Sequence, residues 1–204
     1  ASHHGKVRVG LHAAPRDQEY RDRDGRGLPI RGVREGDLLA PTPECGDDDD
    51  DPTPAQTEGP FFTPRSPKRT SLLEAGMKGT TLLVTGRVFT RSCHPVAGAL
   101  VDFWQADDEG EYDNEGYRLR GHQFTDAQGR YRLNTVVPGL YPGRTRHIHV
   151  KVQAPRRPVL TTQLYFPGEA RNDRDGIFHS ELLMKVAESP DGRVGLFNFV
   201  LDLA

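Results

Sequence analysis

The sequence lacks the features that mark several large classes of protein. It has two cysteines and one tryptophan in 204 residues, and no apolar run comes near the ~20 residues of a membrane-spanning helix. Its 27 Lys and Arg are balanced by 29 Asp and Glu, which gives a net charge of −2. The strong basic excess of proteins that bind nucleic acid or membrane surfaces is absent. The composition therefore predicts a chain that binds neither nucleic acid nor membrane.

The two cysteines, Cys45 and Cys93, do not form a metal-binding pair such as Cys-x-x-Cys. Their spacing is consistent with one disulfide or with two buried thiols, and a disulfide would suit an exported protein. No apolar export segment precedes Ala1, so such a segment either never existed or was removed before this numbering begins.

Residues 1–56 are expected to form an N-terminal arm and an acidic linker, apart from a catalytic domain at 57–204. The arm mixes Arg, Asp and Gly with few apolar residues, so it can bury little surface by itself. The run Asp47 to Asp51 repels itself and is followed by Pro52 and Pro54, which is typical of an extended linker. A calcium site is the alternative, but the run lacks the spaced ligands and the glycine of a calcium loop.

From residue 57 onward, short alternating segments are separated by Gly, Pro, Asp and Asn. Segment 181–187 is compatible with helix or strand, and six other segments are predicted as strands: 80–90, 98–106, 129–135, 146–154, 160–166 and 195–203. With 22 Gly and 16 Pro and few helical periods, this pattern predicts an all-β fold. We expect an antiparallel β-sandwich core with long loops and an irregular N-terminal arm.

A His-x-His pair lies in the segment 146–154. Successive side chains of a strand point to opposite faces, so Ile148 and Val150 would enter the core while His147 and His149 project together on the other face. Two imidazoles at this spacing can reach one metal ion. A polar strand face that happens to carry histidines is the alternative.

Two tyrosines lie in turn-like stretches near that strand. Tyr141 sits in the Gly- and Pro-rich loop 138–144, and Tyr112 sits in the stretch 110–114. Read singly, each tyrosine fits a half-buried anchor whose hydroxyl meets water.

Read together, the motifs of the core follow a known order. They are TEGPFF (57–62), VDFWQA (101–106), GEY (110–112), RLRG (118–121), TD with GRY (125–126 and 129–131), YPGR with HIH (141–144 and 147–149) and LTTQ (160–163). In this order they closely resemble the intradiol ring-cleavage dioxygenases, the family of catechol 1,2-dioxygenase and protocatechuate 3,4-dioxygenase. The resemblance covers about residues 57–203.

The resemblance implies a mononuclear non-haem Fe(III) bound by two tyrosinates and two histidines, which carry over to Tyr112, Tyr141, His147 and His149. It places Tyr141 and His149 as axial ligands and the other two as equatorial. Phenolate is a hard anionic donor that stabilises the ferric state, whereas two histidines with one carboxylate suit ferrous oxygenases.

The resemblance also implies an activity: cleavage of a catechol-type ring with O2 to a cis,cis-muconate-type product. It assigns catalytic roles to Tyr141, to Arg144 beside the substrate and to Gln163 near the iron. The substrate pocket would be lined by Arg144 and by three residues of one segment: Thr57, Pro60 and Phe61. Residues 57–62 contain no cation, so neutral catechols are expected to be preferred over a benzoate.

The chain departs from many catechol dioxygenases in one respect: residues 1–54 do not have the pattern of a long helical N-terminal portion that forms a dimer interface. The sequence therefore leaves undecided whether the chain forms a homo-oligomer. Bacterial relatives of this compact form look secreted, so a secreted protein with a Cys45–Cys93 disulfide is expected. A cytoplasmic protein is the alternative.

Two rival functions remain at the level of sequence. A zinc hydrolase would use His147 and His149 with His122 or His179 as a third ligand, and it leaves both tyrosines unexplained. A β-sandwich binding module would recognise a partner through surface aromatics such as Trp104. That tryptophan is predicted instead to pack inside the sheet structure.

Overall fold

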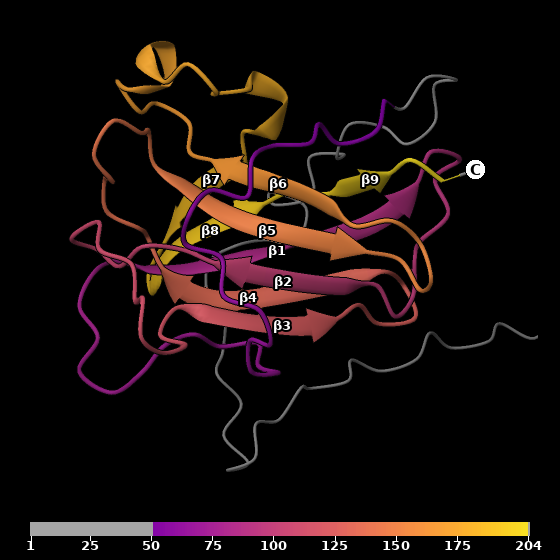
Figure 1. Cartoon of the computed structure of the whole chain (residues 1–204), viewed down its shortest axis with the longest axis horizontal. Helices are drawn as coiled ribbons and strands as arrows, with labels where there is room; N and C mark the ends of the chain where they lie inside the picture. Colours follow the sequence, from indigo (N-terminus) through magenta and orange to yellow (C-terminus); the bar gives the residue numbers. More distant parts are fainter. Residues whose placement is uncertain (1–50, 204) are drawn as a thin grey trace, which may run out of the picture. The chain divides into compact units, whose positions relative to one another are not determined.

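The computed structural model describes residues 51–203, and their nine strands form two sheets that pack face to face (Figure 1). In chain order the elements are β1 Thr81–Thr90, β2 Leu100–Trp104, β3 Arg120–Phe124, β4 Arg130–Val136, β5 His147–Gln153, β6 Leu160–Tyr165, the 3-10 helices η1 Asn172–Arg174 and η2 Ser180–Leu182, β7 Lys185–Ser189, β8 Gly192–Leu196 and β9 Phe199–Leu201. No helix in this part of the chain is long and apolar enough to cross a membrane.

One sheet has the order β4-β1-β8-β7, with β9 also paired to β1, and the other has the order β3-β2-β5-β6. Their inner faces meet in an apolar core because alternate residues of each strand point inward. From the four-stranded sheet come Val101, Phe103, Ile148, Val150 and Val152, and all are fully buried. The predicted all-β sandwich is confirmed.

The pairing is not antiparallel throughout, because β1 runs parallel to both β8 and β9. The predicted strand 195–203 is consequently two strands, which follow β1 one after the other. The break occurs at Gly86, where an added β-carbon would lie 1.7 Å from the carbonyl oxygen of Phe197. The side chain of Asn198 then accepts the Arg87 N–H at 2.8 Å in place of a backbone carbonyl.

The pattern of apolar residues missed strand β3 and left strand β7 ambiguous. The inward-facing positions of β3 are Gly121, which has no side chain, and Gln123, which is polar, so this strand shows no apolar alternation. Gln123 instead bonds to the backbone of Arg132 in the opposite sheet, with its amide at 2.7 Å from the carbonyl oxygen. β7 is a polar strand at an edge. The ambiguous segment 181–187 contains the end of η2 and the first half of β7.

The segment 54–68 crosses the outer face of the four-stranded sheet, and Figure 1 shows it as the indigo trace that passes over β6, β5, β2 and β3. It begins at β6, where Thr162 donates to the Pro54 carbonyl at 2.7 Å. It ends at β2 and β3, where Ser66 donates to Asp102 of β2 at 2.7 Å and Lys68 pairs with His122 of β3. This segment therefore covers the face of the sheet that points away from the core.

The arm and linker predictions for residues 1–50 lie outside the described residues. Cys93 is bonded in a disulfide. Cys45 is the only other cysteine of the sequence and also lies outside the described residues.

Candidate functional site

The outer face of the four-stranded sheet carries a row of four large polar or aromatic side chains, one from each strand. The pairing register aligns Arg120 of β3 with Trp104 of β2, His149 of β5 and Gln163 of β6. His147 faces the same side, one step toward the loops, opposite Tyr165. The alternation predicted for β5 is confirmed, because Ile148, Val150 and Val152 enter the core instead.

The two histidines present their Nε2 atoms to each other at 3.2 Å. His147 Nδ1 lies 2.7 Å from the carbonyl oxygen of Thr145, which can only accept, so Nδ1 carries the proton and Nε2 has a free lone pair. His149 stacks on Trp104 with the ring centroids 4.8 Å apart. Its Nδ1 has no hydrogen-bond partner within residues 51–203.

Both imidazoles are held in the neutral form. Burial lowers the pKa of His147 to about 4, and the nearby Arg144 contributes in the same direction. Burial lowers the pKa of His149 as well, helped by His147 and Arg144. A neutral imidazole is the form that binds a metal ion.

The hydroxyl of Tyr112 joins this pair, because it lies 3.4 Å from His147 Nε2. Its ring stacks on Phe61 at 4.4 Å and meets the ring of Tyr141 edge-on at 5.9 Å. Burial raises the pKa of the Tyr112 phenol well above its ordinary value, although Arg144 and Arg120 oppose the rise. The four predicted ligand side chains are therefore neighbours in space.

The loop that carries Tyr112 is fixed on both sides of the tyrosine. On one side, buried Asp107 accepts the N–H groups of Glu109 and Glu111 at 3.0 Å each. On the other side, buried Arg120 donates to the Asp113 carbonyl at 2.7 Å and to the Phe61 carbonyl at 2.6 Å. Arg120 thus joins the Tyr112 loop to the segment that covers the sheet.

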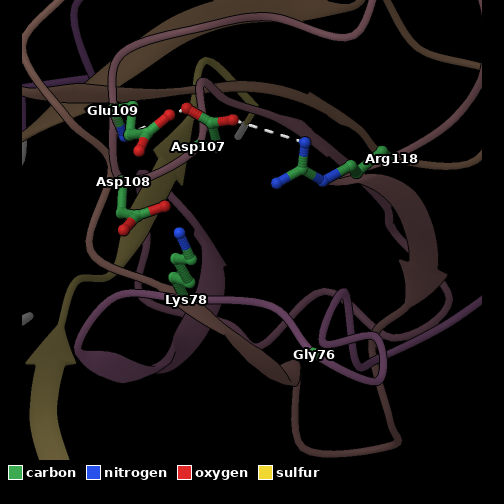
Figure 2. A pocket seen from close by; sticks show the side chains of 6 residues that line it. All are labelled: Gly76, Lys78, Asp107, Asp108, Glu109 and Arg118. Carbon is green, nitrogen blue, oxygen red and sulfur yellow. Dashed lines mark hydrogen bonds and ion pairs between the residues drawn. The ribbon is translucent and has the colours of Figure 1, made fainter.

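A pocket of about 200 Å³ lies beside the start of this loop. Figure 2 shows that its lining is charged, with Arg118 paired to Asp107 at 3.3 Å and Lys78 directed toward Asp108. The predicted site residues do not line it, and one of its acidic residues, Asp107, is the carboxylate that holds the loop.

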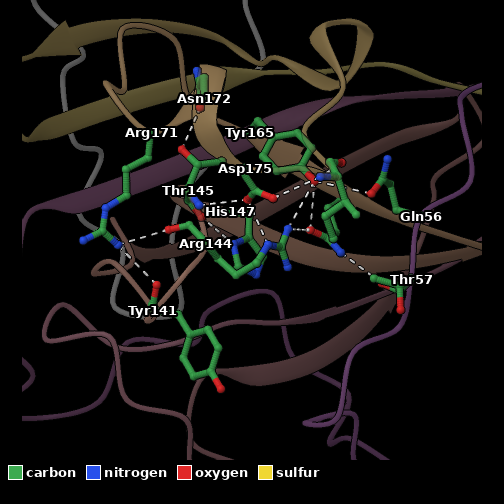
Figure 3. A network of polar contacts seen from close by, with 12 residues as sticks. Gln56, Thr57, Tyr141, Arg144, Thr145, His147, Tyr165, Arg171, Asn172 and Asp175 are labelled. Atoms are coloured by element: carbon green, nitrogen blue, oxygen red, sulfur yellow. Dashed lines mark hydrogen bonds and ion pairs between the residues drawn. The ribbon is translucent and has the colours of Figure 1, made fainter.

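Arg144 is the centre of a polar network on the loops beside β5 (Figure 3). Its Nε lies 2.8 Å from a carboxylate oxygen of Asp175, and its Nη2 donates to Gln163 Oε1 at 2.7 Å. The amide of Gln163 continues the network by donating to the Thr57 carbonyl at 3.0 Å. The structure therefore connects Arg144 and Gln163, two of the three predicted catalytic side chains, to the predicted pocket segment.

The predicted pocket segment passes beside His149 and the two tyrosines. A β-carbon at Gly59, between Thr57 and Pro60, would lie only 3.3 Å from the His149 ring. Phe61 lies against both tyrosine rings, at 4.4 Å from Tyr112 and 5.3 Å from Tyr141. Pro60 is exposed at the surface of this segment.

Sequence reasoning gave no role to two residues that hold the site together, Arg120 and Asp175. Arg120 was visible only as part of the RLRG motif, without a partner. Asp175 lies in a loop with no motif and meets Arg144 across 31 positions of sequence. No local pattern could have indicated that contact.

Within residues 51–203 the structure lacks the zinc ligands and the exposed Trp104 on which the two rival functions were based. His122 is engaged by the Ser66 carbonyl at 2.7 Å, and no group of three His, Cys, Asp or Glu side chains within residues 51–203 could hold a metal ion. The zinc site with His122 or His179 is therefore absent from the described part of the chain. Trp104 is 1% exposed, as predicted, and offers no surface aromatic to a partner.

Two buried histidines on the outer face of a β-sandwich, with two tyrosines on loops beside them, form a set of donors of the kind that binds metal ions. Comparison with known proteins specifies the class. The family model described as Dioxygenase matches residues 57–202. Solved structures similar to this chain include an intradiol ring-cleavage dioxygenase from Tetranychus urticae, at 25% identity and a TM-score of 0.69, covering 74% of this chain and 95% of that one. The chain belongs to the intradiol ring-cleavage dioxygenases.

Other relatives differ in how much of their length is shared. A dioxygenase domain from a dioxygenase carbohydrate-binding protein fusion of Streptomyces sp. SirexAA-E is 62% identical, with a TM-score of 0.74 over 76% of this chain and 100% of that one. Hydroxyquinol 1,2-dioxygenase of Nocardioides simplex is 30% identical over 152 residues, which are 63% of this chain and 52% of that protein. The chain spans between 50% and 62% of the first three curated relatives.

Proposed function

We propose that this chain holds one non-haem Fe(III) and cleaves catechol-type rings with O2 to cis,cis-muconate-type products. The observation that carries the proposal is the convergence of three donor atoms. His147 Nε2 lies 3.2 Å from His149 Nε2 and 3.4 Å from the Tyr112 hydroxyl. Tyr141, whose ring lies 5.9 Å from that of Tyr112, would supply the fourth donor.

The chemistry of these donors fits a ferric ion. Thr145 fixes the proton of His147 on Nδ1, so Nε2 is free to bind. The Nε2 of His149 points toward that atom at 3.2 Å, which places it as the second donor. Burial makes the Tyr112 phenol hard to ionise alone, and a highly charged cation would offset that cost. Two phenolates suit Fe(III) better than a softer divalent metal.

Fe(III), when bound, supplies the Lewis acidity that binds the two catechol oxygens and makes the ring reactive toward O2. The residues of the chain do the rest. Arg144 carries a fixed positive charge that stabilises an electron-rich ring without losing a proton. Tyr141 offers its phenolate oxygen as a base for a proton released by the substrate. Gln163, tied to Arg144 and Thr57, orients the arginine against the pocket segment.

Iron loading tests the proposal. Protein reconstituted with Fe(III) should be red because phenolate bound to Fe(III) absorbs in the visible, and it should consume one O2 for each catechol. Labelled O2 should place both oxygen atoms in the muconate. Protein loaded with Zn²⁺ serves as the matched control and should be colourless and inactive. Colourless protein after ferric reconstitution would refute the ligand assignment.

We further propose that the protein is exported, and the disulfide at Cys93 supports this because such bonds persist in oxidising compartments. Closing the loop between Cys45 and Cys93 would stabilise the fold by ~4 kcal/mol on the chain-entropy model. Thiol titration under denaturing, non-reducing conditions should find no free thiol. Two titratable thiols in protein prepared without reductant would exclude the bridge.

A further inference from the structure

Each tyrosine of the site follows a buried glycine by two positions. Gly110 precedes Tyr112, and Gly139 precedes Tyr141. The two glycines come from separate loops, yet their backbones touch. A β-carbon added to Gly139 would lie 2.3 Å from the amide nitrogen of Gly110, and one added to Gly110 would lie 2.6 Å from the Leu140 carbonyl oxygen. Any side chain at either position would push the loops apart.

Hydrogen bonds hold the two loops at this separation. The carbonyl of Asp107 accepts the Gly139 N–H at 2.5 Å and also the Gly110 N–H at 3.2 Å. The N–H of Asp107 donates to the Glu111 carbonyl at 2.9 Å, and the carboxylate of Asp107 fixes the same turn. One residue therefore bonds to both tyrosine loops, just before each tyrosine.

Gly110 adds a conformational requirement. Its φ is +93°, a region that side chains rarely adopt, whereas Gly139 has no such requirement and is limited only by space. The contact is thus specified twice, by backbone conformation on one loop and by close approach on the other. A turn needed only to reverse the chain would not require glycine at both positions.

We propose that Gly110 and Gly139 are positioning residues that set the separation of the Tyr112 and Tyr141 hydroxyls, so that both can bind one ferric ion. This inference rests on the proposed function. Metal ligands must lie within about 0.2 Å of their ideal distances. A β-carbon at 2.3 Å or 2.6 Å from a backbone atom forces a shift of several tenths of an ångström, which exceeds that tolerance.

The test compares Gly139→Ala and Gly110→Ala with two matched controls. Gly98→Ala matches Gly110→Ala because Gly98 also has a positive φ, and Gly176→Ala matches Gly139→Ala because neither glycine has one. In both controls no atom lies within 4 Å of the added β-carbon. Each protein is titrated with Fe(III), and its visible phenolate band is recorded beside the thermal unfolding of the metal-free protein. We expect both site variants to bind Fe(III) at least about tenfold more weakly, with a displaced band. Both controls should match the wild type in Fe(III) affinity and in the position of the band, and Gly98→Ala should lose only the thermal stability that its positive φ costs.

A double-mutant cycle separates positioning from general stability. In a Tyr141→Phe background one phenolate is already gone, so Gly139→Ala should weaken Fe(III) binding by a smaller factor than it does in the wild type. An equal factor in both backgrounds, or an unchanged band in folded Gly139→Ala and Gly110→Ala, refutes the inference. If neither variant folds, the inference is also refuted, because the contact between the two glycines would then be needed for folding of the β-sandwich. A wild type that binds no Fe(III) refutes the proposed function instead.

Discussion

Asp175 and Arg144 form a buried ion pair with Nε and Oδ2 2.8 Å apart, and their side chains are 3% and 19% exposed. The same carboxylate oxygen accepts the Thr145 N–H at 2.9 Å, two residues before the first histidine. One loop carboxylate therefore fixes both the arginine and the start of the strand that carries the histidines. Removing one partner of such a pair leaves an uncompensated buried charge.

The first prediction is that Asp175→Asn lowers the free energy of unfolding by about 3 kcal/mol near neutral pH. Burial raises the pKa of Asp175, but hydrogen bonds from Thr145 and Arg144 outweigh it and hold the pKa below its ordinary 3.8. A lowered pKa in the folded state stabilises the fold above pH 3.8, and this stabilisation is lost as the pH falls through the folded value. Asp175→Asn should not show this loss of stability at acid pH, because its amide side chain does not titrate. Urea unfolding along a pH series measures both effects.

The exposed pair of Arg91 and Asp202, 3.4 Å apart with side chains 48% and 76% exposed, provides the control. Asp202→Asn should change the free energy of unfolding by less than about 1 kcal/mol. Equal costs for Asp175→Asn and Asp202→Asn would mean that the buried pair contributes no more than a surface contact.

The second prediction concerns Arg144. Arg144→Ala should lower turnover by roughly 10²–10³-fold, because a charge aimed at the reacting ring is lost, while iron content stays near that of the wild type. Arg144→Lys should recover little, since an ammonium cannot contact Asp175 and Gln163 together. Arg193→Ala, at an exposed pair on β8, is the control. Loss of iron from folded Arg144→Ala protein would assign the arginine a structural role.

The third prediction concerns Tyr141. Tyr141→Phe should fold, shift the visible band of the ferric protein and slow turnover, because a phenolate ligand and proton acceptor is removed. Tyr117→Phe is the matched control, since that exposed hydroxyl only donates to the Pro64 carbonyl. Absorption spectra and rates of ring cleavage report on both variants. If Tyr141→Phe leaves the band in place, another tyrosine is the ligand.

Much of the site was predictable because it lies on a regular strand. Alternation along β5 places His147 and His149 on one face, and the buried Ile148 between them anchors the register. Elements whose contacts are not local were harder to predict. Strand β3 has Gly121 and Gln123 at its inward positions, so it lacks the apolar alternation of a strand. The strand predicted at 195–203 is broken because Gly86 lets the backbone of Phe197 approach closely.

The fourth prediction concerns the substrate, and the structure refines its physical basis. The pocket segment contains no cation, but Lys151 of β5 reaches its Glu58 at 2.5 Å and lies over the Phe62 ring at 4.7 Å. Arg144 is paired with Asp175, and Arg120 is bound to backbone carbonyls. Each of these cations therefore already has a partner.

A benzoate carboxylate that entered this site would lose its hydration without gaining a free counter-ion. We expect kcat/KM on catechol or hydroxyquinol to exceed that on protocatechuate by about tenfold or more, which corresponds to roughly 1.4 kcal/mol. Glu58→Gln supplies the decisive comparison, because it releases the charge of Lys151 beside the pocket segment and should raise the relative efficiency on protocatechuate. Side-by-side rates on the three compounds measure both effects. A wild type that prefers protocatechuate would show that one of the paired cations exchanges its partner for the substrate, and the Glu58→Gln ratio would then identify whether Lys151 is that cation.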